Sequence, residues 1–127
     1  MSSSIRFFIC GSALRGEPDH GVLEDAVFLG EIRTAPEYRM HSVDGRHPAV
    51  FLVDRDGVAI AGELYELTPE QHRRLLGQEP PGLYEDDVVL EDRTRARAML
   101  FPRALVEERG YPDVSSRGGW RGGERAP

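Results

Sequence analysis

Short runs of β-branched and aromatic residues, each ended by a turn, recur along this chain and constrain its fold most strongly. The pattern is found at residues 5–10, 30–35, 38–43, 49–53, 58–67, 83–90 and 94–101. Turn residues separate the runs, as at Asp44-Gly45 and at residues 54–57. Runs of this length with such turns between them are typical of strands joined by hairpins. The sequence therefore predicts a largely antiparallel β structure.

One helix is signalled among the strands. Thr68 is a capping residue, Pro69 follows at the first helical position, and Gln71 completes the signature of a capping box. The helix can continue only to about residue 76, because Gly77 and a Pro-Pro-Gly segment after it break the pattern. Residues 102–109 are compatible with a second short helix.

A chain of 127 residues has room for one modest hydrophobic core. We therefore predict a single α+β domain over residues 1–112, built as a small, mostly antiparallel β-barrel or strongly curved sheet with one or two short helices. Residues 113–127 are glycine-rich and form a C-terminal tail that we expect to be partly docked. Trp120 is the only tryptophan. Its apolar area predicts packing on the barrel or on a second copy of the chain in a homodimer.

The charge balance argues against nucleic acid as a partner. All sixteen basic residues are arginine, and together with 22 acidic residues they give a formal net charge of −6. Phosphate binding needs a basic face, whereas residues 17–112 carry twenty acidic residues against eleven arginines. No apolar run is long enough to span a membrane or to form a signal core. The single cysteine, Cys10, fits a reducing compartment, so we expect a cytoplasmic protein.

The loop after the first run is the first candidate site. It reads Cys10-Gly11-Ser12-Ala13-Leu14-Arg15-Gly16, and its glycines would let backbone N–H groups turn inward as a nest for an anion or an oxyanion. A plain tight turn is the competing interpretation, and the loop taken alone favours it. The spacing of a phosphate-binding P-loop is absent, as is the Gly-x-Ser-x-Gly setting of a nucleophilic serine. Cys10 is expected to be a small buried residue rather than a nucleophile.

Glu79 lies between the predicted helix and two prolines, where a carboxylate can be held partly buried. Burial would raise the pKa of this carboxyl and suit it to proton transfer; an ordinary solvated loop acid is the alternative. For Glu63, which lies in a predicted strand, the alternative to a functional role is that it is the outward-facing residue of an edge strand. No metal site is predicted, because ligand spacing is missing from the four histidines, His20, His41, His47 and His72.

The order of these motifs resembles the gamma-glutamylcyclotransferase-like family. The residues that carry the resemblance are Phe8-Ile9-Cys10-Gly11-Ser12-Ala13-Leu14, then Gly62-Glu63-Leu64-Tyr65-Glu66-Leu67, then a short helix, Glu79, and Leu83-Tyr84 with a strand. Members typically carry Tyr-Gly-Ser at the first strand, so Cys10 stands here in place of a tyrosine. They also commonly carry an arginine just after the position of Tyr84, where this chain has Glu85-Asp86-Asp87.

The resemblance implies an enzyme without a cofactor, acting on a small-molecule γ-glutamyl amide. The α-amine of the substrate attacks its own γ-carbonyl, which releases an amine and 5-oxoproline. Carried over to this sequence, Glu79 is the catalytic acid–base, and the substrate-binding residues are Cys10, Gly11, Ser12, Ala13, Leu14 and Tyr84. If Glu79 is the general base, Glu79→Gln is expected to leave stability nearly unchanged and to lower turnover by roughly two to four orders of magnitude. The leaving amine cannot be read from the sequence.

The middle and end of the chain resemble one branch of that family, the C-terminal domain of allophanate hydrolase and its stand-alone relatives. The resemblance rests on Arg33-Thr34-Ala35-Pro36-Glu37-Tyr38-Arg39-Met40, Leu90-Glu91-Asp92, Pro112-Asp113-Val114-Ser115 and Gly118-Gly119-Trp120-Arg121. That branch is associated with decarboxylation of a carbamate-type intermediate and generally lacks an acid at the position of Glu79. The leading hypothesis is therefore a cyclotransferase. A carbamate-processing protein and a non-catalytic binding or assembly module on the same fold are the alternatives.

Overall fold

The predicted β-rich structure is confirmed by a computed structural model that describes residues 4–121. Seven strands are present in this part of the chain: β1 (Ile5–Ile9), β2 (Val27–Arg33), β3 (Tyr38–Val43), β4 (His47–Leu52), β5 (Ala61–Leu67), β6 (Tyr84–Val89) and β7 (Arg95–Leu100). Two α-helices accompany them, α1 (Pro69–Gly77) and α2 (Arg103–Arg109), together with two short 3₁₀ helices, η1 (His20–Leu23) and η2 (Ser115–Arg117). The fold is therefore a small α+β fold with a mostly antiparallel sheet.

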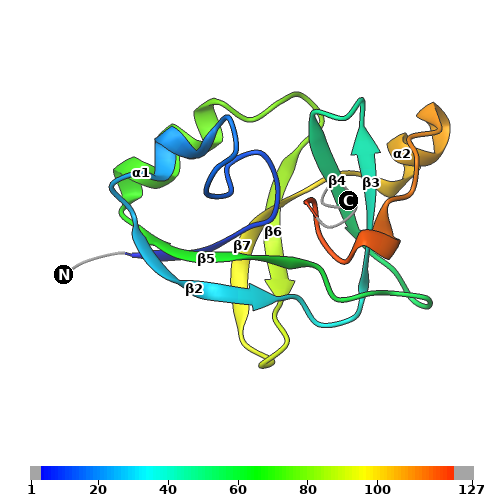
Figure 1. Cartoon of the computed structure of the whole chain (residues 1–127), viewed down its shortest axis with the longest axis horizontal. Helices are drawn as coiled ribbons and strands as arrows, with labels where there is room; N and C mark the ends of the chain where they lie inside the picture. The colour runs from blue at the N-terminus through cyan, green and yellow to red at the C-terminus, as the bar shows by residue number, and fades with distance from the viewer. Residues whose placement is uncertain (1–3, 122–127) are drawn as a thin grey trace.

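The strands form one five-stranded sheet and one separate hairpin. The sheet has the order β2-β5-β1-β7-β6, and β3 and β4 pair only with each other as a two-stranded sheet. Neighbouring strands in the larger sheet are antiparallel except β1 and β7, which are parallel. Figure 1 shows α1 over one end of this curved sheet and the β3–β4 hairpin with α2 at the other end. The loop after β1 lies in the space between these two ends.

A closed barrel is not confirmed. Within the described residues, the two edges of the five-stranded sheet meet only at an isolated antiparallel bridge between Thr34 and Leu90. Two hydrogen bonds flank this bridge, from Ala35 N to Val89 O at 2.9 Å and from Glu91 N to Arg33 O at 2.9 Å. The edges therefore touch after β2 and β6 have ended, and the sheet is strongly curved without a continuous ladder around it.

Helix α1 begins at the predicted position for the predicted reason. The Thr68 hydroxyl accepts a hydrogen bond from Gln71 N at 3.1 Å, and the Gln71 side chain accepts one from Thr68 N at 2.9 Å. These two bonds satisfy backbone donors that the first turn of a helix leaves unpaired. The helix ends at Gly77, and Glu79 N still donates to Leu76 O at 3.4 Å. The position of Glu79 thus follows directly from where this helix stops.

Strand β5 is shorter than predicted and more deeply buried. It begins at Ala61, whereas Val58 forms only an isolated bridge with Tyr38. The expectation that Glu63 is the outward residue of an edge strand is wrong, because β5 lies between β2 and β1 and Glu63 is only 2% exposed. Gly62 beside it is required by close packing, since a Cβ there would lie 2.4 Å from the carbonyl oxygen of Ile9.

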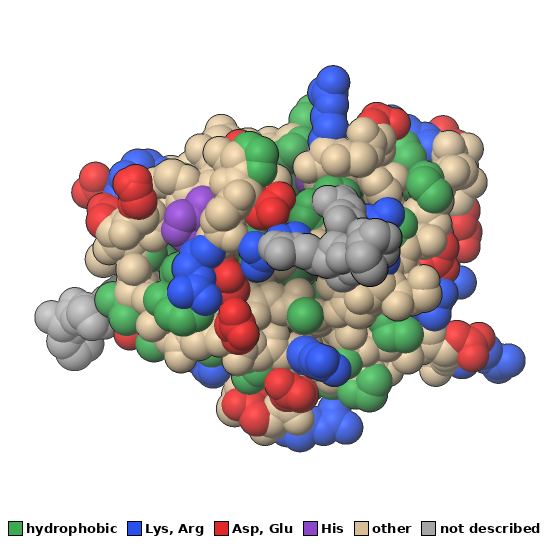
Figure 2. All heavy atoms as spheres, in the orientation of Figure 1, with side chains coloured by type: hydrophobic (Ala, Val, Ile, Leu, Met, Phe, Trp, Pro, Cys, Tyr) green, Lys and Arg blue, Asp and Glu red, His purple; other side chains and the backbone are tan. Residues whose placement is uncertain are grey.

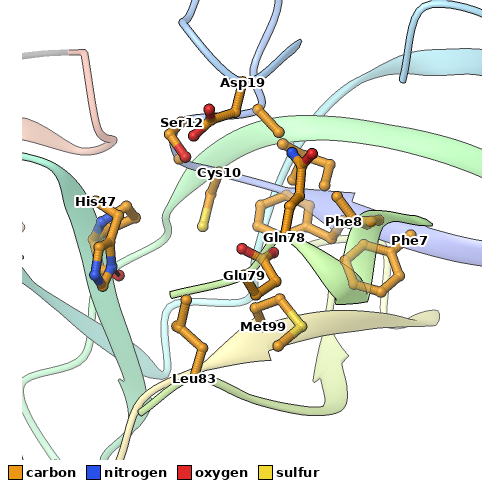
Figure 3. Close-up of a pocket in the computed structure, with 15 residues that line it drawn as sticks. Phe7, Phe8, Cys10, Ser12, Asp19, His47, Gln78, Glu79, Leu83 and Met99 are labelled. Carbon is orange, nitrogen blue, oxygen red and sulfur yellow. Dashed lines mark hydrogen bonds between the residues drawn. The ribbon is translucent and has the colours of Figure 1, made fainter. Parts of the chain in front are cut away.

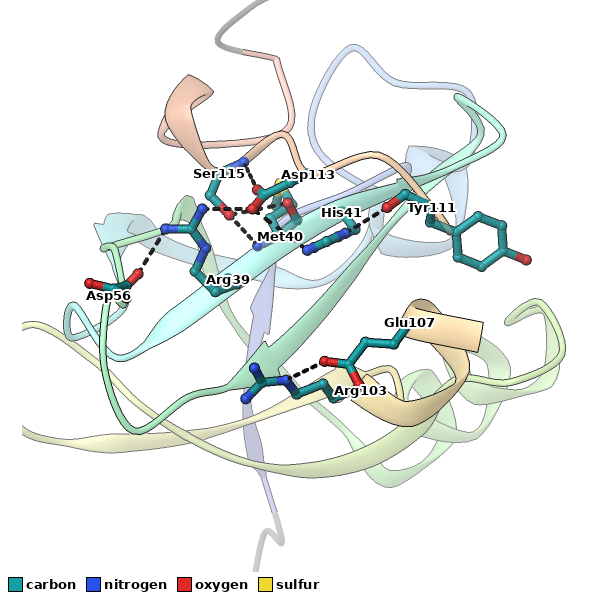
Figure 4. Close-up of polar contacts among 9 residues, drawn as sticks. All are labelled: Arg39, Met40, His41, Asp56, Arg103, Glu107, Tyr111, Asp113 and Ser115. Atoms are coloured by element: carbon teal, nitrogen blue, oxygen red, sulfur yellow. Dashed lines mark hydrogen bonds and ion pairs between the residues drawn. The ribbon is translucent and has the colours of Figure 1, made fainter. Parts of the chain in front are cut away.

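The chain after α2 packs into the core of the same molecule. Val114 and Trp120 are 7% and 4% exposed and belong to the main hydrophobic cluster. Asp113 accepts a 2.6 Å ion pair from Arg39 of β3 and a 2.8 Å hydrogen bond from Ser115 N, as Figure 4 shows. Trp120 therefore docks on its own domain. The part of the predicted tail at residues 122–127 lies outside the described residues.

Candidate active site

The loop after β1 is held against the β3–β4 hairpin by close packing at Gly11. A Cβ added to Gly11 would lie 2.6 Å from Pro48 Cδ, so a larger residue cannot fit without a shift of the hairpin. Leu14 N donates to Gly11 O at 3.1 Å and closes the turn. In residues 4–121, no backbone acceptor is recorded for the amides of Gly11, Ser12 and Ala13. The backbone of residues 4–121 thus leaves these three donors without an acceptor.

The loop forms one wall of a cavity. Its enclosed part has a volume of about 50 Å³, which is room for roughly three to five water molecules. The empty space grows to about 520 Å³ when the part that opens to solvent is included. The lining residues are Phe7, Phe8, Ile9, Cys10, Gly11, Ser12, Ala13, Asp19, His47, Pro48, Leu75, Gln78, Glu79, Leu83 and Met99. Figure 3 shows that they come from β1 and its loop, the end of α1, β4 and β7.

Glu79 brings a carboxyl group with an unusual proton affinity to this cavity. Burial of the carboxyl, followed by repulsion from the nearby Asp19 carboxylate, raises the pKa of Glu79 from 4.5 to about 7. In Figure 3 its side chain extends from the end of α1 toward Cys10 and Met99. A carboxyl with a pKa near neutrality is present in both protonation states under ordinary conditions. It can therefore accept a proton and return it within one reaction.

Cys10 presents an uncharged thiol to the same cavity. Burial, followed by the charge of Glu79, raises the pKa of the Cys10 thiol to about 12. Nucleophilic attack by cysteine requires the thiolate, which such a thiol does not form near neutral pH. Cys10 follows the end of β1 and is half-buried rather than fully buried, and it borders the cavity.

The structure brings most of the sequence-predicted site residues together. Cys10, Gly11, Ser12, Ala13 and Glu79 all line the cavity. The remaining two, Leu14 and Tyr84, do not.

Leu14 is buried and lines a separate open groove beside β2 and the C-terminal segment. Tyr84 is the first residue of β6 and is 43% exposed. Its chain neighbour Leu83 lines the cavity instead, since successive residues of an extended segment point to opposite sides.

Sequence reasoning missed Asp19, His47 and Met99, which also line the cavity. These residues lie just before η1, in β4 and in β7, so their meeting depends on the packing of the hairpin and the sheet rather than on spacing along the chain. The only sequence signal for Asp19 and His47 was that they are polar residues close to predicted turns. Many other residues of this sequence have the same property, so the signal could not single them out.

A buried network holds the far end of the loop in place. Glu63 accepts hydrogen bonds from Arg15 N at 3.0 Å and Arg15 Nε at 3.3 Å, and one from the Tyr65 hydroxyl at 3.0 Å. Arg121 lies 3.5 Å from the same carboxylate and donates to Arg15 O at 2.6 Å. Loop, strand β5 and C-terminal segment are thus joined at one carboxylate. The burial of Glu63 is explained by these four donors, because a buried charge needs partners.

The surface, the remaining side-chain clusters and the helices add three observations. On the face shown in Figure 2, acidic and basic side chains are interspersed rather than gathered into a basic patch. In the part of the chain that the structure covers, no three or more His, Cys, Asp or Glu side chains are arranged to hold a metal ion. No helix in residues 4–121 is long and apolar enough to cross a membrane.

Comparison with known protein families tests the family relationship that the order of the motifs indicated. A sequence model of the allophanate hydrolase C-terminal domain matches residues 5–123. The chain belongs to this family. The family recognition made from the sequence is therefore confirmed, including the branch to which residues 33–40 and 112–121 pointed. No curated protein matches the chain in a sequence search.

Solved structures place this family member among similar folds. A uropathogenic E. coli-specific protein is 26% identical, with a TM-score of 0.86 and 94% of each chain covered. Kluyveromyces lactis allophanate hydrolase is 21% identical with a TM-score of 0.84; the match covers 94% of this chain but only 21% of that enzyme. A gamma-glutamyl cyclotransferase is 18% identical with a TM-score of 0.57, covering 87% of this chain and 70% of the other. The last two likenesses concern the fold alone.

Proposed function

We propose that this protein is a gamma-glutamyl cyclotransferase-type enzyme that uses Glu79 as its acid–base group. The substrate is a small γ-glutamyl amide, and the products are 5-oxoproline and a free amine. The observation that carries the proposal is the half-buried Glu79 carboxyl, with a pKa of about 7, in a cavity that the loop of residues 10–13 also lines. The gamma-glutamyl cyclotransferase among the similar folds supports the same reading.

The first chemical step is the transfer of a proton. An α-ammonium group has no lone pair, so it must lose a proton before its nitrogen can attack. The ionised form of Glu79 accepts that proton, and the pKa near neutrality makes the transfer efficient at neutral pH. The freed nitrogen then forms a bond to the γ-carbonyl carbon of the same molecule. Both reacting groups belong to one substrate, so the enzyme has only to favour the folded-back conformation.

The second step breaks the amide bond. The tetrahedral intermediate places a negative charge on the former carbonyl oxygen, and the loop amides at Gly11, Ser12 and Ala13 are the donors available to stabilise it. Protonated Glu79 returns its proton to the leaving nitrogen as the carbon–nitrogen bond breaks. The ring nitrogen, which became cationic when it bonded to the carbonyl carbon, gives its extra proton to the departing amine, which leaves as an ammonium ion. Water is neither consumed nor produced, and Glu79 ends as it began. The neutral Cys10 thiol beside Glu79 takes no part in the bond changes.

Decarboxylation of a carbamate is the second candidate, and the family match over residues 5–123 favours it. In that reaction protonated Glu79 would donate its proton to the carbamate nitrogen, the carbon–nitrogen bond would break, and carbon dioxide would leave. The same cavity and the same carboxyl would serve. The two functions therefore differ in substrate and product rather than in the position of the reacting group.

A product assay separates these functions. The purified protein is incubated with a panel of γ-glutamyl amines and γ-glutamyl amino acids while 5-oxoproline is measured, and with small N-carboxylated amines while carbon dioxide is measured. Our proposal predicts 5-oxoproline from at least one γ-glutamyl amide. Carbon dioxide release that depends on Glu79, without 5-oxoproline, would replace it with the carbamate function. The absence of turnover in both series would favour a non-catalytic binding module.

A further inference from the structure

The charges that face the cavity favour a positively charged ligand group. Its titratable lining residues are Cys10, Asp19, His47 and Glu79, and no arginine is among the described residues that line it. The chain has sixteen arginines, but none of those described lines this cavity. The two acidic side chains in the lining, Asp19 and Glu79, therefore have no arginine beside them there to balance their charge. Opposite charges attract strongly where water is partly excluded. A cationic group is therefore the natural occupant of the space that these carboxylates face.

Asp19 is the acidic residue at the mouth of this cavity. Its backbone amide donates to Ser12 O at 2.9 Å, which fixes the start of η1 against the loop. In Figure 3 its carboxylate lies beside Ser12, on the opposite side of Cys10 from Glu79. Asp19 is exposed, whereas Glu79 lies deeper. Asp19 therefore lines the solvent-facing part of the cavity, and Glu79 lines a more enclosed part.

The Asp19 side chain makes no structural contact that accounts for its position. It occupies the N-cap position of η1, yet it forms no side-chain capping hydrogen bond. Some exposed acidic residues pair with arginine, such as Asp25 with Arg74 at 3.3 Å and Glu37 with Arg93 at 3.3 Å, and others, such as Asp54, have no recorded ion pair within residues 4–121 but lie outside the cavity. In the described part of the chain no ion pair or side-chain hydrogen bond is recorded for Asp19. An unpaired carboxylate at a cavity mouth is suited to bind a ligand cation.

We propose that Asp19 binds the α-ammonium group of the substrate and holds it in the cavity for deprotonation by Glu79. This assignment rests on the proposed function, because it names the residue that orients the attacking nitrogen. The influence of Asp19 on the proton affinity of Glu79 supports it, since the two carboxylates are close enough to interact. Two acids thus have different tasks: exposed Asp19 binds the cation, and half-buried Glu79 cycles the proton.

A pair of uncleavable probes tests the assignment by calorimetry. L-Methionine sulfone carries an α-ammonium and places its sulfone sulfur where a γ-glutamyl substrate has its γ-carbonyl carbon; 4-(methylsulfonyl)butanoate is the same molecule without the amino group. The wild type should bind the first roughly ten- to a hundredfold more tightly, the range of one charge-assisted hydrogen bond. Asp19→Asn should reduce this preference to less than about threefold. Asp54→Asn, a change at an exposed aspartate outside the cavity, should leave it intact.

Each outcome decides a separate point. If Asp19→Asn folds and keeps the wild-type preference for the ammonium probe, the assignment of Asp19 is overturned while the cyclotransferase function stands. If the preference depends on Asp19 but no γ-glutamyl amide yields 5-oxoproline, the ammonium site stands and the cyclotransferase function is overturned. If the wild type binds neither probe, the ammonium site is overturned directly. Circular dichroism of both variants establishes that each is folded.

Discussion

Replacing Glu79 by glutamine should stabilise the protein at neutral and alkaline pH. The folded state holds the Glu79 proton up to a pH of about 7, whereas the unfolded chain releases it near 4.5. Between these values the unfolded state binds fewer protons, so the free energy of unfolding falls as the pH rises through this window and is level above it. The difference between 4.5 and about 7 corresponds to about 3 kcal/mol, at about 1.4 kcal/mol for each pKa unit.

Glutamine keeps the size of the side chain and removes this cost. The variant should therefore match the wild type near a pH of about 4 and exceed it by about 3 kcal/mol near a pH of about 8. This prediction differs from the sequence-based expectation of nearly unchanged stability, because the Glu79 carboxyl has a raised pKa in the folded protein. Urea unfolding followed by the fluorescence of Trp120, which is buried and the only tryptophan, measures the difference at each pH.

The matched control is Glu24→Gln, the same substitution at an exposed carboxylate outside the cavity. It should change stability by less than about 0.5 kcal/mol at every pH. A difference between Glu79→Gln and the wild type that does not vary with pH would refute the reasoning. So would a variant that is less stable than the wild type at alkaline pH, because the Glu79 carboxylate would then be stabilised rather than penalised by the fold.

Three further predictions concern other parts of the site. Gly11→Ala should lower the free energy of unfolding by about 1–3 kcal/mol in urea titrations, because the new Cβ meets Pro48; an unchanged value would show that the hairpin yields. The Cys10 thiol, with a pKa of about 12, should resist iodoacetamide near a pH of about 8 and react once urea unfolds the chain, so rapid labelling of the folded protein would contradict its burial. Glu63→Gln should cost about 1–3 kcal/mol in thermal or urea unfolding, since it weakens the hydrogen bonds from Arg15, Tyr65 and Arg121 to a side chain that is itself buried; Glu66→Gln on the same strand is the control.

The sequence was informative where local chemistry decides the structure. The capping box at Thr68 fixes the start of α1, and the proline-rich segment after Gly77 ends it, so the helix and the place of Glu79 could be predicted. The turn at Asp44-Gly45 likewise located the β3–β4 hairpin. In each case the deciding interactions lie within a few residues of one another.

Long-range packing decided the features that the sequence did not reveal. The alternating pattern along β5 is compatible with an outward-facing Glu63. It does not reveal that Arg15 and Arg121, from distant parts of the chain, donate to this carboxylate. Asp19 and His47 reach the cavity only through the packing of η1 and β4 around the first loop. The closed barrel was inferred from the number of strands, whereas closure depends on how the edges of the sheet meet, and these meet at a single bridge.

The most direct test of the central claim is the rate of 5-oxoproline release by the wild type and by Glu79→Gln at matched concentrations. The γ-glutamyl amide that the wild type converts fastest serves as substrate, and circular dichroism establishes that both proteins are folded. We expect the variant to be slower by roughly two to four orders of magnitude, the range that general acid–base catalysis supplies, while Glu24→Gln keeps the wild-type rate. Equal rates for the wild type and Glu79→Gln would contradict the assignment of Glu79 as the proton-transfer group.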